Sequence, residues 1–391
     1  MNRIYLDYNA TTPLHPDVHE GMEPYFRDVF GNPSSIHWFG QGAHRAIENA
    51  RRQVANLIGA EPNEIVFTSG GTESNNHAIR GVAGLKKGCS HHIITSQIEH
   101  RAVLNTCGYL EKKGFQITYL PVDEYGFVDP RSVSTALDDN TILITIMLAN
   151  NDVGSIQNLK EIAETVQGRG IVVHTDAAQA AGKILVDVKQ LGVDMLSMSG
   201  HKLYGPKGIG ALYIKRGIKV NSLIFGGNHE KNRRAGTENV PGIVGLGKAC
   251  EIASNELIQN AARITLLRDK LEKGILSQVP HVRLNGHPER RLPNTSNLSF
   301  SFIEGESLLM NLDLAGIAVS AGSACTSGST EPSHVLTAMG VIPEQGRGSI
   351  RFSLGRGTSE SEIAQTIKAV VEIVGRLREE SPLYADSGSI S

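Results

Sequence analysis

Short apolar segments rich in β-branched residues alternate with helical patterns between residues 60 and 215. Seven such segments occur, and their sequences are EIVFTSG, HHIITS, QITYLPV, TILITIM, GIVVHTDAA, VDMLSMSG and GIGALYI. Strands that alternate with helices predict a mostly parallel sheet with helices on both faces. Ligands of such sheets bind where the strands end and the loops begin. We therefore expect an α/β fold with a seven-stranded sheet and a site at its edge.

A second, smaller α/β unit is predicted after Val240. Two long helical patterns run from there to about Gln278, and the later segments NTSNLSFSFI and GSIRFSLG have the pattern of strands. A last helical pattern extends from about Ser359 to Arg378. The boundary between the units is expected within the long helical region near residue 262. We predict a large domain over 16–262 and a small domain formed by 1–15 and 263–391.

The composition is that of a globular α/β enzyme. The chain has 391 residues, of which 40% are apolar and 20% charged, with 42 glycines. Its formal net charge is −2, so no excess of basic residues indicates nucleic acid or an anionic membrane as a partner. No window approaches about 18 apolar residues, and the N-terminus lacks an apolar core behind a basic start. We expect a cytoplasmic protein with no direct nucleic-acid or membrane binding.

Several cofactor and metal classes are excluded because their motifs are missing. No GxGxxG occurs, and the segment GIVGLGKA ends in Ala249, where a phosphate-binding P-loop needs Ser or Thr. The 14 histidines include no HExxH, which leaves a zinc hydrolase unsupported. The four cysteines form no CxxC pair, which argues against a disulfide framework and a structural zinc site. Cys107 and Cys250 lie in helical patterns and are expected to be ordinary core or surface residues.

Two strand ends carry groups suited to an anion and to a cation. In FTSGGTES, residues 67–74, the small residues around Gly71 and Thr72 let backbone N–H groups approach an anion at the start of a helix. Alone, this pattern is more often an ordinary N-cap with a glycine turn. Asp176 follows the apolar run of IVVHTDAAQAAG, so its carboxylate needs a cap, solvent or a cationic partner.

Two further strand ends carry Lys202 and His100. Lys202 separates two apolar strand-like segments and follows Ser199, Gly200 and His201. A lysine in this position suits Schiff-base chemistry, because partial desolvation lowers the pKa of its amine. A lysine that snorkels from a strand end is the simpler alternative. His100 closes a strand and starts a helix, where a capping or core histidine is the more common case.

One ligand accounts for these strand ends together. Pyridoxal 5′-phosphate (PLP) needs a seat for its phosphate, a carboxylate for its protonated ring nitrogen and a lysine for its aldehyde. The three needs correspond to the glycine turn at Gly71 and Thr72, to Asp176 and to Lys202. The residues therefore predict a PLP enzyme, in which the charged ring acts as an electron sink.

Cys325 lies in the segment SAGSACTSGS, residues 320–329, among Ser, Gly, Ala and Thr. A free cysteine usually behaves as a small buried hydrophobe, and this composition offers it almost nothing to pack against. The segment alone is typical of a flexible linker. We expect the thiol to be mobile.

In its ordered motifs the chain resembles the NifS/IscS cysteine desulfurases, which are class V, fold-type I PLP enzymes. The likeness covers nearly the whole length. It rests on YLDYNATTPLHP, FGNPSSIH, IVFTSGGTESNN, IEHRAVL, ANNDVG, HTDAAQAAGK, SMSGHKLYGPKGIGALY, RRAGTENV, SAGSACTSGSTEPSHVL and SIRFSLGRGT. The resemblance implies a fold-type I PLP-dependent transferase fold, PLP as cofactor, and a homodimer with shared active sites.

The resemblance also implies roles for cofactor-binding residues. Lys202 would hold PLP as a Schiff base, and Asp176 would pair with the ring nitrogen. His100 would stack on the ring and take part in proton transfer. The other contacts would come from Gln179 at the ring hydroxyl, Asn151 beside the ring, Gly71, Thr72, Ser199 and His201 at the phosphate, and Thr237 at the phosphate of the neighbouring subunit's cofactor.

For the substrate, the resemblance implies that Arg356 clamps the carboxylate and that Arg351 makes structural pairs. Asn151 and Asn32 would approach the substrate. Cys325, on a loop over about 320–334 of the small domain, would attack the sulfur of cysteine as a thiolate. The products would be L-alanine and a persulfide on Cys325.

The function implied is that of a cysteine desulfurase whose persulfide passes to an acceptor, with an iron–sulfur scaffold as the expected partner. Cys325 could contact a cluster there as a transient ligand, and no firm metal site is predicted. Sulfur acceptors in tRNA thiolation, DNA phosphorothioation or thiamine routes stay open. So do another class V enzyme, such as an aminotransferase or a selenocysteine lyase, and a noncatalytic sulfur-relay subunit.

Overall fold

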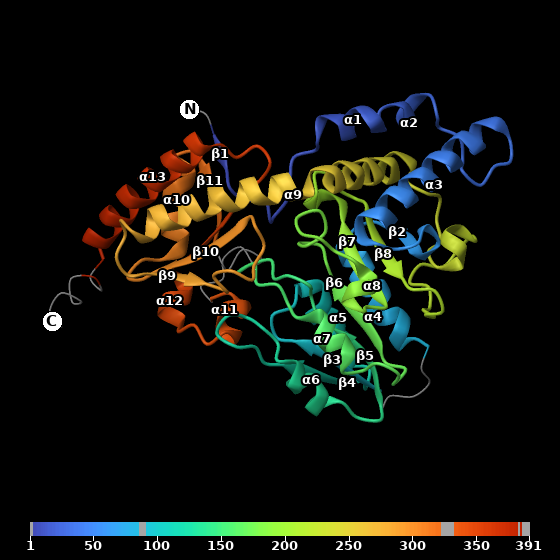
Figure 1. Ribbon diagram of the computed structural model, residues 1–391, viewed down its shortest axis with the longest axis horizontal. Coiled ribbons are helices and arrows are strands. Elements are labelled where there is room, and N and C mark those ends of the chain that lie inside the picture. The colour runs from blue at the N-terminus through green and yellow to red at the C-terminus, as the bar shows by residue number, and fades with distance from the viewer. Residues whose placement is uncertain (1–2, 86–90, 322–331, 382–383, 385–391) are drawn as a thin grey trace.

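The computed structural model describes residues 3–85, 91–321, 332–381 and 384. Its main sheet has the strand order β2-β8-β7-β6-β5-β3-β4. The strands are β2 (Ile65–Thr68), β3 (His92–Ser96), β4 (Gln116–Leu120), β5 (Thr141–Thr145), β6 (Val172–Asp176), β7 (Met195–Ser199) and β8 (Gly210–Ile214). Only β8 pairs antiparallel with its neighbours, so the predicted seven-stranded, mostly parallel sheet is confirmed (Figure 1).

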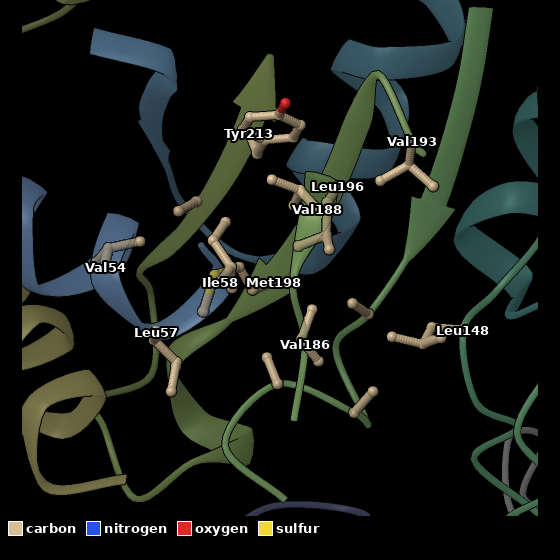
Figure 2. Close-up of a cluster of buried hydrophobic side chains, with 14 of the residues drawn as sticks. Val54, Leu57, Ile58, Leu148, Val186, Val188, Val193, Leu196, Met198 and Tyr213 are labelled. Atoms are coloured by element: carbon tan, nitrogen blue, oxygen red, sulfur yellow. The ribbon is translucent and has the colours of Figure 1, made fainter. Parts of the chain in front are cut away.

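Helices cover both faces of this sheet, because successive strand residues point to opposite sides. Met195 belongs to the apolar cluster under α4 (Gly71–Ala83) and α5 (Arg101–Glu111), whereas Leu196 belongs to the cluster under α3 (Trp38–Ile58) and α9 (Val240–Leu276). Figure 2 shows the second cluster, in which Val54 and Ile58 of α3 face Met198 of the sheet. The helices of this unit are α1 (Pro16–Met22), α2 (Pro24–Arg27), α3 (Trp38–Ile58), α4 (Gly71–Ala83), α5 (Arg101–Glu111), α6 (Pro130–Ala136), α7 (Leu159–Glu164) and α8 (Val188–Leu191), with 3-10 turns at η1 (Pro62–Glu64), η2 (Gly200–Lys202) and η3 (His229–Asn232).

The smaller unit contains an antiparallel sheet with the order β12-β13-β10-β9. Two of its strands were predicted, in NTSNLSFSFI and GSIRFSLG. The strands are β9 (Val282–Asn285), β10 (Thr295–Phe300), β12 (Ser320–Ala321) and β13 (Ser349–Ser353), and β1 (Ile4–Tyr5) pairs separately with β11 (Ile317–Ala318). Its helices are α10 (Gly305–Leu314), α11 (His334–Ala338), α12 (Pro343–Arg347) and α13 (Glu360–Glu379). Leu6 joins this unit's core, so the N-terminal segment packs here.

One helix, α9 (Val240–Leu276), connects the two units (Figure 1). Two helical patterns were expected in this region, and the structure shows a single helix of 37 residues. Residues 251–263 contain no glycine or proline that would end it. Its residues up to Cys250 pack in the large core, and those from Ile264 pack in the small one. Among the described residues, no helix combines the length and apolar character needed to span a bilayer.

Candidate active site

A cavity of about 730 Å³ opens at the edge of the main sheet, where β2, β6 and β7 end. Its lining includes the predicted residues Gly71, Thr72, His100, Asn151, Asp176, Gln179, Ser199, His201 and Lys202. The structure therefore brings together residues that are up to about 130 positions apart in the sequence, since Gly71 and Lys202 line one cavity. This is the position that the strand pattern predicted for a ligand.

The anion-binding end of the cavity is the start of α4. Gly70 occupies the N-cap position with φ 153°, a conformation that residues with a side chain rarely adopt. The first N–H groups of a helix lack intrahelical acceptors and attract anions. Ser199 approaches from β7, because a Cβ built on Gly71 would lie 3.5 Å from the Cβ of Ser199. His201 lines the same end, and burial together with the charges of Lys202 and Lys207 lowers its pKa to about 4, so it is a neutral imidazole.

Asp176 ends β6 and is 7% exposed. Its Oδ2 accepts a hydrogen bond from Nδ2 of Asn75 at 2.6 Å, and its Oδ1 accepts one from the backbone N–H of Ala178 at 2.9 Å. Both donors are neutral, and no ion pair of Asp176 occurs within the described part of the chain. A buried carboxylate without a cationic partner is costly, so the site fits a cationic ligand group.

Lys202 lies at the end of η2, directly after β7. Its Nζ donates to the carbonyl oxygen of Asn9 and, at 2.7 Å, to that of Ala10. Both acceptors are neutral carbonyl groups from the segment that follows β1. These hydrogen bonds hold the amine inside the cavity, where a lysine that reacts with an aldehyde is expected to lie.

His100 both caps a helix and lines the cavity, so the two roles considered for it in the sequence occur together. Its Nδ1 accepts a hydrogen bond from the backbone N–H of Ala102 and caps α5, and its ring also lines the cavity. Because Nδ1 is the acceptor, the proton of the neutral ring is on Nε2. His100 can thus present an N–H donor to a ligand. The neighbouring Glu99 is fully buried, and burial raises its pKa to about 8.

The two arginines of the last strand region occupy different places. Arg351 lines the active-site cavity, and its side chain is 7% exposed. Arg356 instead lines a separate cavity of about 50 Å³, where its Nη2 pairs with Glu256 of α9 at 2.6 Å. Arg351 makes the structural pairs that were expected of it, with Asp7 at 2.9 Å and the carbonyl oxygen of Asn151 at 3.1 Å, and it also lines the cavity. Arg356, which was expected at the substrate, does not line this cavity. Arg351 lies within β13 and faces the cavity, whereas Arg356 follows the strand in a turn directed at α9.

Comparisons with known proteins agree with this site. The class-V aminotransferase family model matches residues 4–366. A relative named cysteine desulfurase IscS, from Methanosarcina thermophila, is 53% identical over 97% of this chain and 94% of its own length. A solved NifS-like protein has a TM-score of 0.91 and 40% identity, over 96% of this chain and all of that one. A structure of SspA in complex with cysteine has a TM-score of 0.80 and 39% identity, over 90% of this chain and 99% of the SspA chain.

The chain belongs to the class-V aminotransferase family, in its cysteine desulfurase branch. Enzymes of this family use PLP. The cavity fits that cofactor: the start of α4 suits the phosphate, the unpaired carboxylate of Asp176 suits the ring nitrogen, and Lys202 suits the aldehyde. The fold class and the cofactor expected from the motifs are thus confirmed.

Three predicted residues of this desulfurase-family chain lie away from the cavity lining. Asn32 is exposed, and its Oδ1 accepts a hydrogen bond from the backbone N–H of Ser34. Thr237 is exposed and lines a different hollow, next to Ser69. Arg356 is the third. Cys325 lies outside the described residues.

Asn9 and Lys183 are among the residues at or beside the site that the sequence analysis missed. Asn9 accepts from Lys202 through its carbonyl oxygen, and its Nδ2 donates to the carbonyl oxygen of Asn151 at 3.1 Å. Lys183 donates from Nζ to Oε1 of Gln179 at 2.7 Å and to Oδ1 of Asn9 at 3.1 Å. Both residues lie in segments that carried the family resemblance, YLDYNATTPLHP and HTDAAQAAGK, so membership of these segments was the available signal.

Proposed function

We propose that this member of the cysteine desulfurase branch converts L-cysteine to L-alanine and stores the sulfur as a persulfide on Cys325. The observation that carries the proposal is the joint placement of Lys202, Asp176 and Arg351 around one cavity. Together they offer an amine for the cofactor, a carboxylate for its ring and a guanidinium for the carboxylate of an amino acid. The related SspA, whose structure is described as a complex with cysteine, supports the same substrate.

When bound, PLP supplies an electron sink for carbanion chemistry at the substrate. Among the residues of this chain, Asp176 offers a charged acceptor for a protonated ring nitrogen, with Asn75 and Ala178 holding its oxygens in place. Lys202 would hold the aldehyde, and the two backbone carbonyl groups that accept from its amine keep the side chain at the cavity. The N–H groups at the start of α4, with Thr72, Ser199 and His201, bind the phosphate.

Arg351 binds the substrate carboxylate in this proposal. Its side chain lines the cavity, and its terminal nitrogens reach two groups of the cavity wall, Asp7 and the carbonyl oxygen of Asn151. A guanidinium matches a carboxylate with two parallel hydrogen bonds. His100 donates and takes up a proton at Nε2, because its Nδ1 is occupied by the backbone N–H of Ala102.

The sulfur-transfer step uses the thiolate of Cys325. Its sulfur forms an S–S bond with the substrate sulfur while the Cβ–S bond of the substrate breaks. The electron pair of that bond stays on the carbon skeleton, which takes up a proton and leaves as alanine. An external thiol or an acceptor protein then removes the outer sulfur from Cys325 and regenerates the thiolate.

A homodimer with shared sites is part of the proposal. Asn32 and Thr237 lie outside the cavity of their own chain, and a position across a dimer interface accounts for both. An exposed aromatic group also supports an interface: Phe30 is 67% exposed, Trp38 73% and Phe39 47%. We further propose a cytoplasmic enzyme with an iron–sulfur scaffold as sulfur acceptor, as the IscS names of the relatives suggest.

The test compares sulfide release from L-cysteine, with a reductant present, for the wild type and Cys325→Ala. Release by the wild type alone, with both proteins retaining the visible absorption of bound PLP, supports the persulfide step. Equal release by both would place sulfur transfer elsewhere. Amino transfer to a ketoacid that survives Cys325→Ala would instead indicate an aminotransferase.

A further inference from the structure

Arg351 lies between two carboxylates that come from distant parts of the chain. Its Nη2 donates to Oδ1 of Asp7 at 2.9 Å, and its Nη1 is 3.9 Å from Oδ1 of Asp152. Nη1 also donates to the carbonyl oxygen of Asn151 at 3.1 Å. Asp7 and Asn151 line the active-site cavity, whereas Asp152 does not. The position of the guanidinium thus depends on one carboxylate inside the cavity and on one behind it.

Each carboxylate also holds a serine that borders residues 322–331. Ser320, two residues before that segment, donates from Oγ to Oδ1 of Asp7 at 3.0 Å and accepts from Nη2 of Arg351 at 3.1 Å. Ser333, two residues after the segment, donates from Oγ to Oδ2 of Asp152 in a short hydrogen bond. The two ends of the segment that contains Cys325 are therefore connected to the same guanidinium.

The connection at Ser333 is buried and well supported. Ser333 and Asp152 are each 5% exposed, and Ser333 also caps α11 by accepting from the backbone N–H of Val335 at 3.2 Å. His334 donates from Nε2 to the carbonyl oxygen of Glu99, the residue before His100, at 3.0 Å. The apolar side chains of α11 pack with Ile98, Met147 and Val153. Interactions with charged groups in such dry surroundings are stronger than at a surface.

We propose that Asp152 and Ser333 are positioning residues that couple binding of the substrate carboxylate at Arg351 to the anchoring of the Cys325 segment. The coupling rests on the proposed function, since it assumes that Arg351 binds the carboxylate of L-cysteine. The hydroxyl of Ser333 donates a hydrogen bond to Asp152. This bond weakens the attraction of Asp152 for the Arg351 guanidinium, which the substrate carboxylate must also bind. Without that hydroxyl, Asp152 attracts Arg351 more strongly, and the substrate carboxylate binds Arg351 more weakly. The change thus acts on the substrate although Ser333 and Asp152 lie outside the cavity lining.

The experiment measures kcat and KM for L-cysteine by sulfide release for the wild type, Ser333→Ala, Asp152→Asn and the double variant. Ser333→Ala is expected to raise KM at least threefold. In the Asp152→Asn background the same change is expected to alter KM less than twofold, because the competing charge is gone. Ser359→Ala is the matched control, since Ser359 caps α13 in the same way and lies on the exposed surface.

A second measurement avoids turnover altogether. The rate at which iodoacetamide alkylates Cys325 in the protein without PLP is expected to rise at least threefold in Ser333→Ala and to stay unchanged in Ser359→Ala. If Ser333→Ala does not fold, Ser333→Gly carries both comparisons, because glycine is tolerated at N-caps with a smaller loss of stability.

Three results would overturn the proposal. A KM for Ser333→Ala within twofold of the wild type removes the coupling to Arg351. A KM effect of equal size in the Asp152→Asn background assigns it to something other than Asp152. Equal alkylation rates in the two alanine variants remove the anchoring of the Cys325 segment. Failure of the proposed function looks different, since the wild type itself would then release no sulfide.

Discussion

Arg351→Lys separates the two candidate arginines by a graded loss of function. Lysine keeps a cation between Asp7 and the buried Asp152, so both carboxylates retain a partner and the protein is expected to fold. Lysine cannot form the two parallel hydrogen bonds of a guanidinium to a carboxylate. Loss of one charge-assisted hydrogen bond costs about 1.5–3 kcal/mol. Since about 1.4 kcal/mol corresponds to tenfold, kcat/KM for L-cysteine should fall by roughly 10- to 150-fold.

The assay compares Arg351→Lys with Arg356→Lys in sulfide release over a range of L-cysteine concentrations. Arg356→Lys should change kcat/KM less than about twofold, because Arg356 pairs with Glu256 and does not line the cavity. The Arg356 side chain is also 30% exposed, and ion pairs at such exposed positions contribute little to stability. Cysteamine lacks the carboxylate, so its inhibition constant should be nearly equal in the wild type and in Arg351→Lys. A large loss in Arg356→Lys with normal kinetics in Arg351→Lys would refute the assignment.

Three other predictions follow from single residues. Burial raises the pKa of Glu99 from 4.5 to about 8, so its stabilising contribution is present at low pH and is lost as the pH rises from about 4.5 to about 8. Tm should therefore fall less between pH 5 and pH 8 in Glu99→Gln than in the wild type, and parallel curves would contradict this. Burial also raises the pKa of the Cys107 thiol to about 12, so iodoacetamide at pH 8 should modify Cys107 only after denaturation, as peptide mass spectrometry can show. Gly70→Ala should weaken the binding of PLP to the apoprotein at least fivefold, as measured by a fluorescence titration. The reason is that the backbone angle φ of 153° costs a residue with a Cβ about 1–3 kcal/mol. An unchanged affinity for PLP would contradict the role of this turn.

The parts of the fold that depend on local pattern were predictable. The apolar run HHIITS became β3 (His92–Ser96), and the last helical pattern became α13 (Glu360–Glu379). The helical region after Val240 was harder, because its periodicity weakens between the two cores that it spans. Residues 251–263 have no fully buried side chain, although Ile252 and Ala253 pack against the large core, and they remain helical because nothing in them ends a helix.

The candidate site shows a different limit. Lys202, Asp176 and Thr72 were identifiable because each ends or follows an apolar strand segment. The choice between Arg351 and Arg356 depended on a partner about a hundred residues away, since Glu256 of α9 receives the guanidinium of Arg356. His100 shows that the two interpretations of a motif can both hold, because one ring nitrogen caps α5 while the ring lines the cavity.

The short segment after β1 connects the two units at the active site. Asp7 pairs with Arg351 of the small unit, and the carbonyl oxygen of Asn9 accepts from Lys202 of the large unit. The side chain of Asn9 also donates to Oγ1 of Thr295 on β10 at 2.8 Å. This segment is itself held by the pairing of β1 with β11 and by the bridge between Asp7 and Ser353 of β13. Because the amine and the guanidinium must contact opposite ends of one small substrate, these contacts contribute to the spacing on which recognition of an amino acid depends.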